Sequence, residues 1–349
     1  MHPSFQRLMA DATQLTRAGD LRAATAAIQA ALHGTAPAAN DEAGVIDVQA
    51  REVQRERDIE APVAPPSPSH DAGRFIASGY LHSAGSRDYK LYVPPGYEGQ
   101  ALPLVVMLHG CTQDPDDFAL GTRMNEAALE RSFFVLYPAQ AHNANPSRCW
   151  NWFKHNHQSR DRGEPALLAD MTREVVNRYG IDARRVYVAG LSAGGAMAAI
   201  LGDAYPDVFA AIGVHSGLPP RSATNAKMAF EAMRCGATAG AEPNAGAAPA
   251  IVFHGDQDKT VHPINGRQIV AARAGGTTPE IQRRRSSDGR EFTHHAYRDA
   301  DGRVVAEHWV VHGAGHAWSG GNPRGSYTDS RGPDATEEML RFFFTQSPA

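Results

Sequence analysis

The pattern of apolar and polar positions divides the chain into three parts. Apolar side chains recur at spacings of three and four within residues 4–33, which predicts a helical hairpin over residues 1–34. Residues 35–72 mix prolines, alanines and charges without such a period, and we interpret them as a disordered linker. From residue 73 to 349, short apolar runs alternate with helix-length segments, which indicates one folded domain.

The order of elements from residue 73 onward predicts the fold class. Two alternating runs, 75–82 and 88–93, predict a hairpin that turns near Gly85. After it, the expected strands are 102–108, 133–137, 185–189, 209–214, 250–254 and 306–311, and the expected helices are 116–131, 165–179, 193–205, 264–273 and 334–344. This alternation predicts an α/β fold with a mostly parallel central sheet, helices on both faces and leading antiparallel strands. Residues 221–249 form a weakly patterned insertion, and the sequence does not say whether it is a lid.

Composition and charge exclude several classes of protein. The 349 residues are 42% hydrophobic and 21% charged, which is ordinary for a globular protein. A formal net charge of −4 does not suggest a surface that binds nucleic acid. The basic run 283–285 is typical of a solvated turn. No apolar run predicts a membrane span. Residues 1–30 lack the apolar core of a signal peptide, so we expect a cytoplasmic protein, with extracellular release by a non-Sec route as the alternative.

Cysteine and histidine spacing says little about disulfides and argues against metals. The chain has three cysteines, a count that argues against a disulfide scaffold. If one bridge forms, Cys111 and Cys149 are the first candidates, because both lie near the motifs described below. The sequence contains neither His-Glu-x-x-His nor paired Cys-x-x-Cys, so we expect no metal site.

Ser192 is the candidate nucleophile. It lies in the pentapeptide Gly-x-Ser-x-Gly at 190–194, between an apolar strand and an alanine-rich helix. A sharp strand-to-helix turn of this kind holds a serine hydroxyl above a sheet. The motif alone is weak evidence, because a helix can also begin with small residues. A serine also needs a base and an acid, and in hydrolases of this sheet type both follow it along the chain.

The acid and the base each have two candidates. Asp256 and Asp258 both follow the predicted strand 250–254, and position alone does not separate them. We favour Asp258, because the longer offset lets the chain turn back toward the histidine. His312 ends the last predicted strand, whereas His316 lies in the glycine-bounded loop after it, and we favour His316. We expect most other histidines to be solvated.

A tetrahedral intermediate also needs N–H donors. The N–H of Ala193, which begins the helix after the serine, is one candidate. The N–H of Cys111, in the loop after strand 102–108, is the other. The elements of a serine hydrolase therefore fall in the right order along the chain.

Five segments together resemble the polyhydroxybutyrate (PHB) depolymerase family of esterases. They are LHGCTQ (108–113), CWNWF (149–153), GLSAGGAM (190–197), HGDQDKTV (254–261) and GHAWSGG (315–321). The resemblance covers about residues 75–345 and implies an α/β-hydrolase catalytic domain at 73–349. It maps the nucleophile to Ser192, the acid to Asp258, the base to His316 and the oxyanion donor to Cys111. The family also includes feruloyl and acetylxylan esterases, which are the alternative reading of the function.

The resemblance further implies an aliphatic polyester or oligomer substrate and no cofactor, as in intracellular members that act on PHB granules. We expect Trp150, Trp152 and Trp318 to form an apolar floor for such a chain, with core packing as the alternative. Residues 4–33 are candidates for a homo-oligomer contact or for docking on a granule surface. A granule-binding protein with a vestigial triad is the non-enzymatic alternative.

Overall fold

A computed structural model describes residues 72–237 and 246–346. The helical hairpin expected at 1–34, the linker expected at 35–72 and the contacts proposed for residues 4–33 lie outside these residues, apart from Ala72 itself. The described residues form a ten-stranded sheet in the order β1-β2-β4-β3-β5-β6-β7-β10-β9-β8. The strands in this order are Arg74–His82, Gly85–Val93, Phe134–Pro138, Leu104–Leu108, Val186–Leu191, Ala211–His215, Ala250–Gly255, Val304–Val311, Glu291–Arg298 and Glu280–Arg285.

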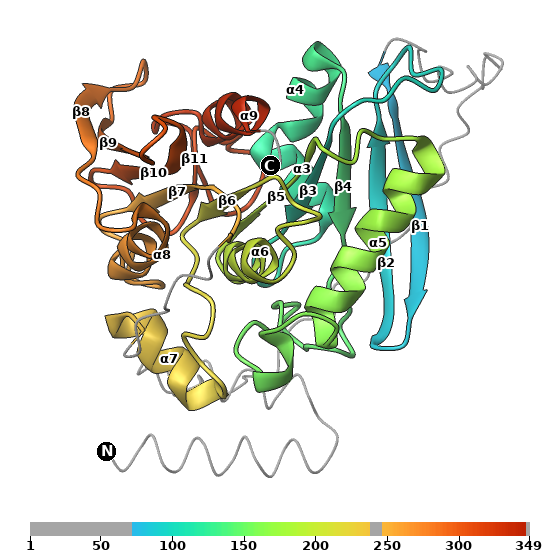
Figure 1. The fold of residues 1–349 in the computed structure, drawn as a ribbon, viewed down its shortest axis with the longest axis horizontal. Coiled ribbons are helices and arrows are strands. Elements are labelled where there is room, and N and C mark those ends of the chain that lie inside the picture. Colours follow the sequence, from blue (N-terminus) through green and yellow to red (C-terminus); the bar gives the residue numbers. More distant parts are fainter. Residues whose placement is uncertain (1–71, 238–245, 347–349) are drawn as a thin grey trace, which may run out of the picture. The chain divides into compact units, whose positions relative to one another are not determined.

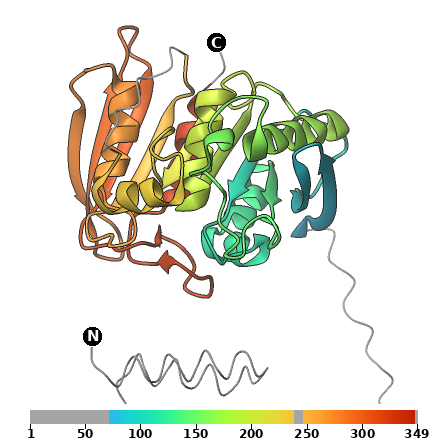
Figure 2. The same ribbon diagram turned by 90° about the horizontal axis from the view of Figure 1, so that it is seen from below.

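The centre of this sheet is parallel and both ends are antiparallel. From β4 through β3, β5, β6 and β7 to β10, every neighbouring pair is parallel. The hairpin of β1 and β2 closes one end, and β9 and β8 extend the other beside β10. Figure 2 shows the strands running side by side from the first hairpin to the second. The α/β fold with a mostly parallel sheet is confirmed.

Helices cover both faces of the sheet. They are α3 (Pro115–Thr122), α4 (Met124–Arg131), α5 (Gly163–Tyr179), α6 (Ala193–Ala204), α7 (Ala226–Cys235), α8 (Ile264–Ala274) and α9 (Ala335–Thr345), with a 3₁₀ turn, η2, at His155–His157. One core cluster joins α5, α6 and α8 to the sheet, and the other joins α3, α4 and α9 to its opposite face (Figure 1). Strands β3 to β7 are buried along their whole length, because helices cover both of their faces. A short pair, β11 (Trp318–Ser319) and β12 (Thr328–Asp329), lies outside the main sheet.

Two expectations about local structure were wrong, and the structure adds a helix where the sequence pattern was weak. The single helix expected at 116–131 is two helices, because Arg123 takes a left-handed conformation at φ 55° and breaks it. The basic run 283–285 belongs to the edge strand β8, which pairs with β9, rather than to a turn. The insertion at 221–249 contains α7, which begins where the Asn225 side chain accepts a hydrogen bond from the Met228 N–H.

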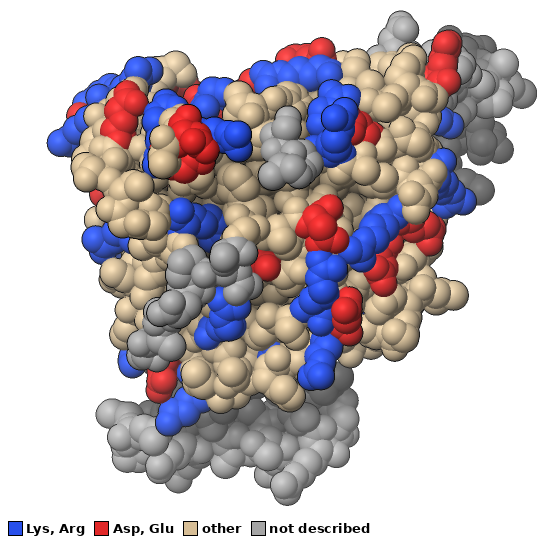
Figure 3. Space-filling view, viewed as in Figure 1, with Lys and Arg blue, Asp and Glu red and all other residues tan. Residues whose placement is uncertain are grey.

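Charged side chains of both signs are interleaved on the face shown in Figure 3. Several of the described ions are paired: Arg160 and Arg173 both contact the carboxylate of Asp207. Exposed pairs of this kind contribute little to stability. Among the described residues, no helix combines the length and the hydropathy that a membrane crossing requires.

Candidate active site

Ser192 occupies a strained turn between β5 and α6. Its backbone has φ 58° and ψ −117°, a conformation that non-glycine residues rarely adopt. A Cβ atom on Gly190 would lie 2.4 Å from the Gly194 carbonyl carbon, and one on Gly194 would lie 2.0 Å from the Leu108 oxygen. Both glycines of the motif are therefore required by close backbone approach. The N–H of Ser192 donates to the His215 carbonyl at 2.9 Å, which ties the turn to the end of β6.

Asp258 and His316 form a close pair beyond the ends of β7 and β10. Asp258 Oδ2 accepts a hydrogen bond from His316 Nδ1 at 2.7 Å, and the Asp258 side chain is fully buried. Its Oδ1 accepts from the N–H groups of Thr260 and Val261. Burial alone would raise the pKa of Asp258, but the imidazoles of His254 and His316 and the Val261 N–H together hold it far below its usual value. The carboxylate stays ionised, fixes the proton on Nδ1 and leaves Nε2 of His316 to act as a base.

The competing residues form a second aspartate–histidine pair. Asp256 Oδ2 accepts from His312 Nδ1 at 2.9 Å, and its Oδ1 accepts from the Gly313 N–H. Thr293 Oγ1 lies 2.8 Å from His312 Nε2, so both nitrogens of this imidazole are occupied. His312 therefore has no free nitrogen with which to activate a serine. This geometry favours Asp258 and His316 as the catalytic pair.

The loop after β3 presents one unused N–H near Ser192. Three of its N–H groups are engaged: Gly110 donates to Gln113 Oε1, Thr112 to the Ser147 carbonyl and Gln113 to the Gly110 carbonyl. Among the described residues, the N–H of Cys111 has no acceptor. The N–H of Ala193 is the first of α6, and a first helical N–H has no partner within its helix. Cys111 and Ala193 both line the cleft that contains Ser192, so both donors are available to an oxyanion.

A disulfide holds the loop after β3, residues 109–113, which we call the oxyanion loop. Cys111 and Cys149 are bonded across 38 positions of sequence, with their Cα atoms 4.2 Å apart. This is the pair singled out from the sequence, and Cys235 is free and exposed. The bond joins the loop after β3 to the segment that carries Trp150 and Trp152.

We expect Cys149→Ala to lower both stability and turnover. Opening a loop of this length should cost about 4 kcal/mol, which lowers the melting temperature by about 10 °C. A less ordered Cys111 N–H should lower kcat by about tenfold, a fraction of the effect of losing an oxyanion donor. Calorimetry and ester hydrolysis measure the two effects, and Cys235→Ala is the matched control. An unchanged melting temperature in Cys149→Ala would contradict the role assigned to the bond.

A small apolar cleft opens beside Ser192. Its volume is about 260 Å³, and its walls carry Trp152, Phe153, Leu218, Ala229, Phe230, Met233 and Val261. Three of these residues come from α7, so part of the weakly patterned insertion forms a wall of the cleft. Phe230 lines the cleft and is 71% exposed to solvent. The cleft suits a short aliphatic acyl group.

Two of the three tryptophans do not belong to this cleft. Trp150 and Trp318 are 0% and 1% exposed. The Trp150 indole donates to the His109 carbonyl, and the Trp318 indole donates to Thr336 Oγ1 while its ring stacks on His215. Both are core residues, and their expected role as a substrate floor is wrong. Only Trp152 lines the cleft.

Three histidines to which the sequence analysis gave no role are buried beneath the site and support it. His109, His215 and His254 are each 1% exposed. His109 accepts from the Gln140 N–H, and its Nδ1 donates to the Gly110 carbonyl in the oxyanion loop. His215 accepts from the Ser319 N–H, and burial lowers its pKa to about 3. His254 donates to the Val261 carbonyl and lies 3.5 Å from Asp258. Each lies at the carboxyl end of a central strand, which is the sequence signal for them.

Fold and site together define an α/β hydrolase with a serine at its nucleophile turn. Acetyl xylan esterase from Aspergillus awamori has a similar fold, with a TM-score of 0.61 at 18% identity over 78% of this chain and 99% of that one. A family model described as Esterase PHB depolymerase matches residues 87–293, and the chain belongs to this family.

Two curated proteins are similar to this chain in sequence. Poly(3-hydroxyalkanoate) depolymerase C of Paucimonas lemoignei is 33% identical over 241 residues, which are 64% of this chain and 57% of the relative. Poly(3-hydroxybutyrate) depolymerase of Ralstonia pickettii is 33% identical over 242 residues, which are 62% of this chain and 48% of the relative. The chain thus spans about half the length of these relatives.

Among the described residues, no group of three or more histidine, cysteine or acidic side chains could hold a metal ion.

Proposed function

We propose that the chain is a serine carboxylic-ester hydrolase that cleaves poly(3-hydroxybutyrate) or its oligomers through an acyl-enzyme. The observation that supports it most is the 2.7 Å pair of His316 and buried Asp258, which follow β10 and β7 in the same parallel part of the sheet as β5, the strand before Ser192. The names of the two curated relatives support the polyester substrate. The small apolar cleft beside Ser192 is compatible with a short aliphatic repeat.

The reaction follows from the roles of these groups. Ser192 Oγ attacks the ester carbonyl carbon while His316 Nε2 takes the hydroxyl proton, and the carbonyl electron pair moves onto oxygen. The N–H groups of Cys111 and Ala193 stabilise this oxyanion. When the carbonyl re-forms, the alcohol end of the polymer leaves with the proton from His316, and an acyl-Ser192 ester remains. Water, deprotonated by His316, then releases the hydroxy acid and restores Ser192.

A panel of substrates tests this proposal. Purified protein and Ser192→Ala should be compared on amorphous PHB granules, 3-hydroxybutyrate oligomers, p-nitrophenyl butyrate and methyl ferulate. We expect serine-dependent release of 3-hydroxybutyrate from granules or oligomers, and slower hydrolysis of the ferulate, whose rigid aromatic acyl group differs from a short aliphatic repeat. Activity on p-nitrophenyl butyrate or ferulate alone would support the serine esterase mechanism and exclude the polymer as substrate.

The alternative functions predict different results in the same panel. A feruloyl or acetylxylan esterase would prefer aromatic or acetyl esters, and the likeness to an acetyl xylan esterase supports only the shared fold. A granule-binding protein with a vestigial triad would bind granules and release nothing. The intact Ser192, Asp258 and His316 weigh against that reading.

Location and assembly form a separate part of the proposal. We expected a cytoplasmic protein from the sequence, with an extracellular one as the alternative. The Cys111–Cys149 disulfide favours an oxidising compartment, because such bonds rarely persist in a reducing cytoplasm. Granule association and homo-oligomerisation through residues 4–33 remain predictions from the sequence.

A further inference from the structure

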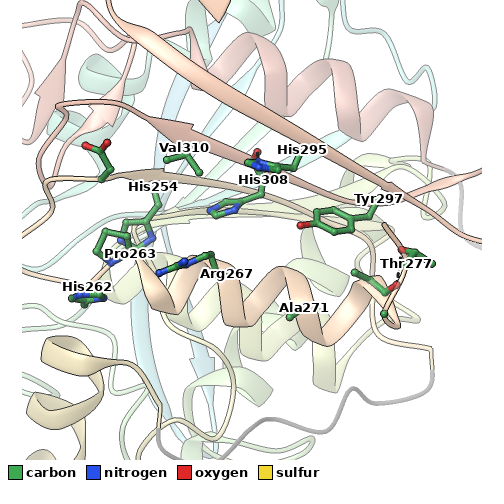
Figure 4. Close-up of a pocket in the computed structure, with 13 residues that line it drawn as sticks. His254, His262, Pro263, Arg267, Ala271, Thr277, His295, Tyr297, His308 and Val310 are labelled. Carbon is green, nitrogen blue, oxygen red and sulfur yellow. Dashed lines mark hydrogen bonds between the residues drawn. The ribbon is translucent and has the colours of Figure 1, made fainter. Parts of the chain in front are cut away.

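A second and larger cavity lies between helix α8 and strands β9 and β10 (Figure 4). Its volume is about 700 Å³, within the usual range for small-ligand sites and larger than the cleft at Ser192. Pro263, Ala271 and Val310 contribute apolar surface, while histidines, a tyrosine and an arginine contribute polar groups. We call this cavity the α8 pocket.

Two buried imidazole nitrogens that face α8 have no hydrogen-bond partner. They are Nδ1 of His254 and Nε2 of His308, on side chains that are 1% and 4% exposed. Because His254 Nε2 donates to the Val261 carbonyl, its Nδ1 is a free acceptor. Burial lowers the pKa of His308 to about 3, so the His308 ring is neutral. Unpartnered buried polar atoms are uncommon and call for an explanation.

Gly266 lets the backbone of α8 pack closely against both nitrogens. A Cβ atom at this position would lie 2.8 Å from His254 Nδ1 and 3.3 Å from His308 Nε2. Any other residue at this position would press on the His254 ring and displace it. In Figure 4 the two imidazoles and the Tyr297 hydroxyl lie between α8 and the strands. Both rings line the pocket, so a ligand hydroxyl that reaches either nitrogen would find an unused acceptor there.

Arg267 supplies an uncommitted positive charge in the same pocket. Its side chain is exposed and forms no ion pair or hydrogen bond with any described residue. His262 Nδ1 accepts from the Ile264 N–H, so its Nε2 carries a proton that it can donate. Asp256, the acidic side chain of the pocket, is already bound by His312 and the Gly313 N–H. These free N–H donors favour an anionic ligand. A carboxylate suits the site, because its two oxygens can accept two parallel hydrogen bonds from the Arg267 guanidinium.

One segment separates the α8 pocket from the catalytic groups. His254 forms a wall of the pocket, donates to the Val261 carbonyl and lies 3.5 Å from Asp258 Oδ2. Val261 in turn lines the cleft at Ser192. A ligand that moves the His254 ring would therefore shift the carboxylate that orients His316.

We propose that the α8 pocket binds a short-chain aliphatic hydroxy acid, and that its occupancy slows catalysis through His254 and Asp258. The carboxylate would lie on Arg267 and His262, the hydroxyl on His254 or His308, and the aliphatic chain against Ala271 and Val310. The choice of ligand rests on the proposed function, because hydrolysis of a hydroxyalkanoate polyester releases acids of this class. The pocket is then a site of product feedback.

Binding is measured first on the inactive variant Ser192→Ala by calorimetric titration with 3-hydroxybutyrate. We expect one saturable site that Arg267→Gln weakens by about 10- to 100-fold, since hydrogen bonds to a charged group are lost. Ala271→Phe, at an exposed position of α8, should fill the pocket and abolish binding. Arg178→Gln, on the exposed surface of α5, is the matched control and should bind normally. Butyrate and the methyl ester of 3-hydroxybutyrate should bind more weakly, because each lacks one anchor.

Inhibition of the active protein tests the coupling. With p-nitrophenyl acetate as substrate, 3-hydroxybutyrate should lower kcat, and Arg267→Gln should remove this effect while its uninhibited kcat is unchanged. Absence of saturable binding, or purely competitive inhibition that persists in Arg267→Gln and Ala271→Phe, would overturn the proposal. Either failure leaves hydrolysis by Ser192 intact, whereas a failed esterase assay with normal binding would count against the proposed function alone.

Discussion

Replacing Ser192 by alanine should lower kcat on p-nitrophenyl butyrate by about 10⁶-fold, the loss seen when a serine-hydrolase nucleophile is removed. The reason is that no other described hydroxyl follows β5 on the strained turn beside the Cys111 and Ala193 donors. A small residual rate over water should remain, because the oxyanion donors and the cleft are untouched. Steady-state hydrolysis, with active-site titration of the wild type, measures the loss.

The fold should survive this change. Alanine has the same Cβ atom as serine, so it meets the same backbone strain at φ 58° and adds no new clash. We expect a melting temperature within a few degrees of the wild type. Ser222→Ala is the matched control, since its buried hydroxyl has no partner among the described residues and its loss should cost little. Wild-type turnover by Ser192→Ala would rule out the acyl-enzyme mechanism.

Most of the fold could be predicted because the central strands are buried on both faces. Continuous apolar runs such as β3 and β5 are hard to mistake when helix-length segments separate them. The edge strand β8 was missed because it is held by pairing with β9 and its side chains point to solvent. The break at Arg123 was missed because nothing in the sequence marks a non-glycine residue in the left-handed region.

The sequence predicted the order of the candidate triad residues and favoured Asp258 and His316, but position alone did not separate them from Asp256 and His312. Asp256 and Asp258 both follow β7, so their position made them equally good candidates for the acid. In the structure, each of them contacts a histidine. What separates them is Thr293, which occupies Nε2 of His312 from β9, a strand that the sequence pattern did not reveal. The tryptophans failed for a different reason: proximity to a motif in sequence does not distinguish a cleft wall from the core beneath it.

The two aspartates therefore make the sharpest comparison in this molecule. Asp258→Asn should lower kcat by about 10⁴-fold, because a neutral amide no longer fixes the proton on His316 Nδ1 or stabilises the imidazolium. Asp256→Asn should change kcat by less than about tenfold, since its partner His312 has no free nitrogen for chemistry. Both substitutions keep the shape of the side chain, and each residue accepts backbone N–H bonds that an asparagine oxygen can still accept.

Combining the changes distinguishes a catalytic role for Asp258 from a structural one. Residues of a triad act as a unit, so Ser192→Ala with Asp258→Asn should be no slower than Ser192→Ala alone. Asp256→Asn should instead act independently of Ser192, as expected of a site outside the reaction. Measured kcat values for the single and double variants, with melting temperatures as a check on folding, decide the matter. A loss of about 10⁴-fold in Asp256→Asn, with Asp258→Asn near wild type, would transfer the role of the acid to Asp256 and that of the base to His312.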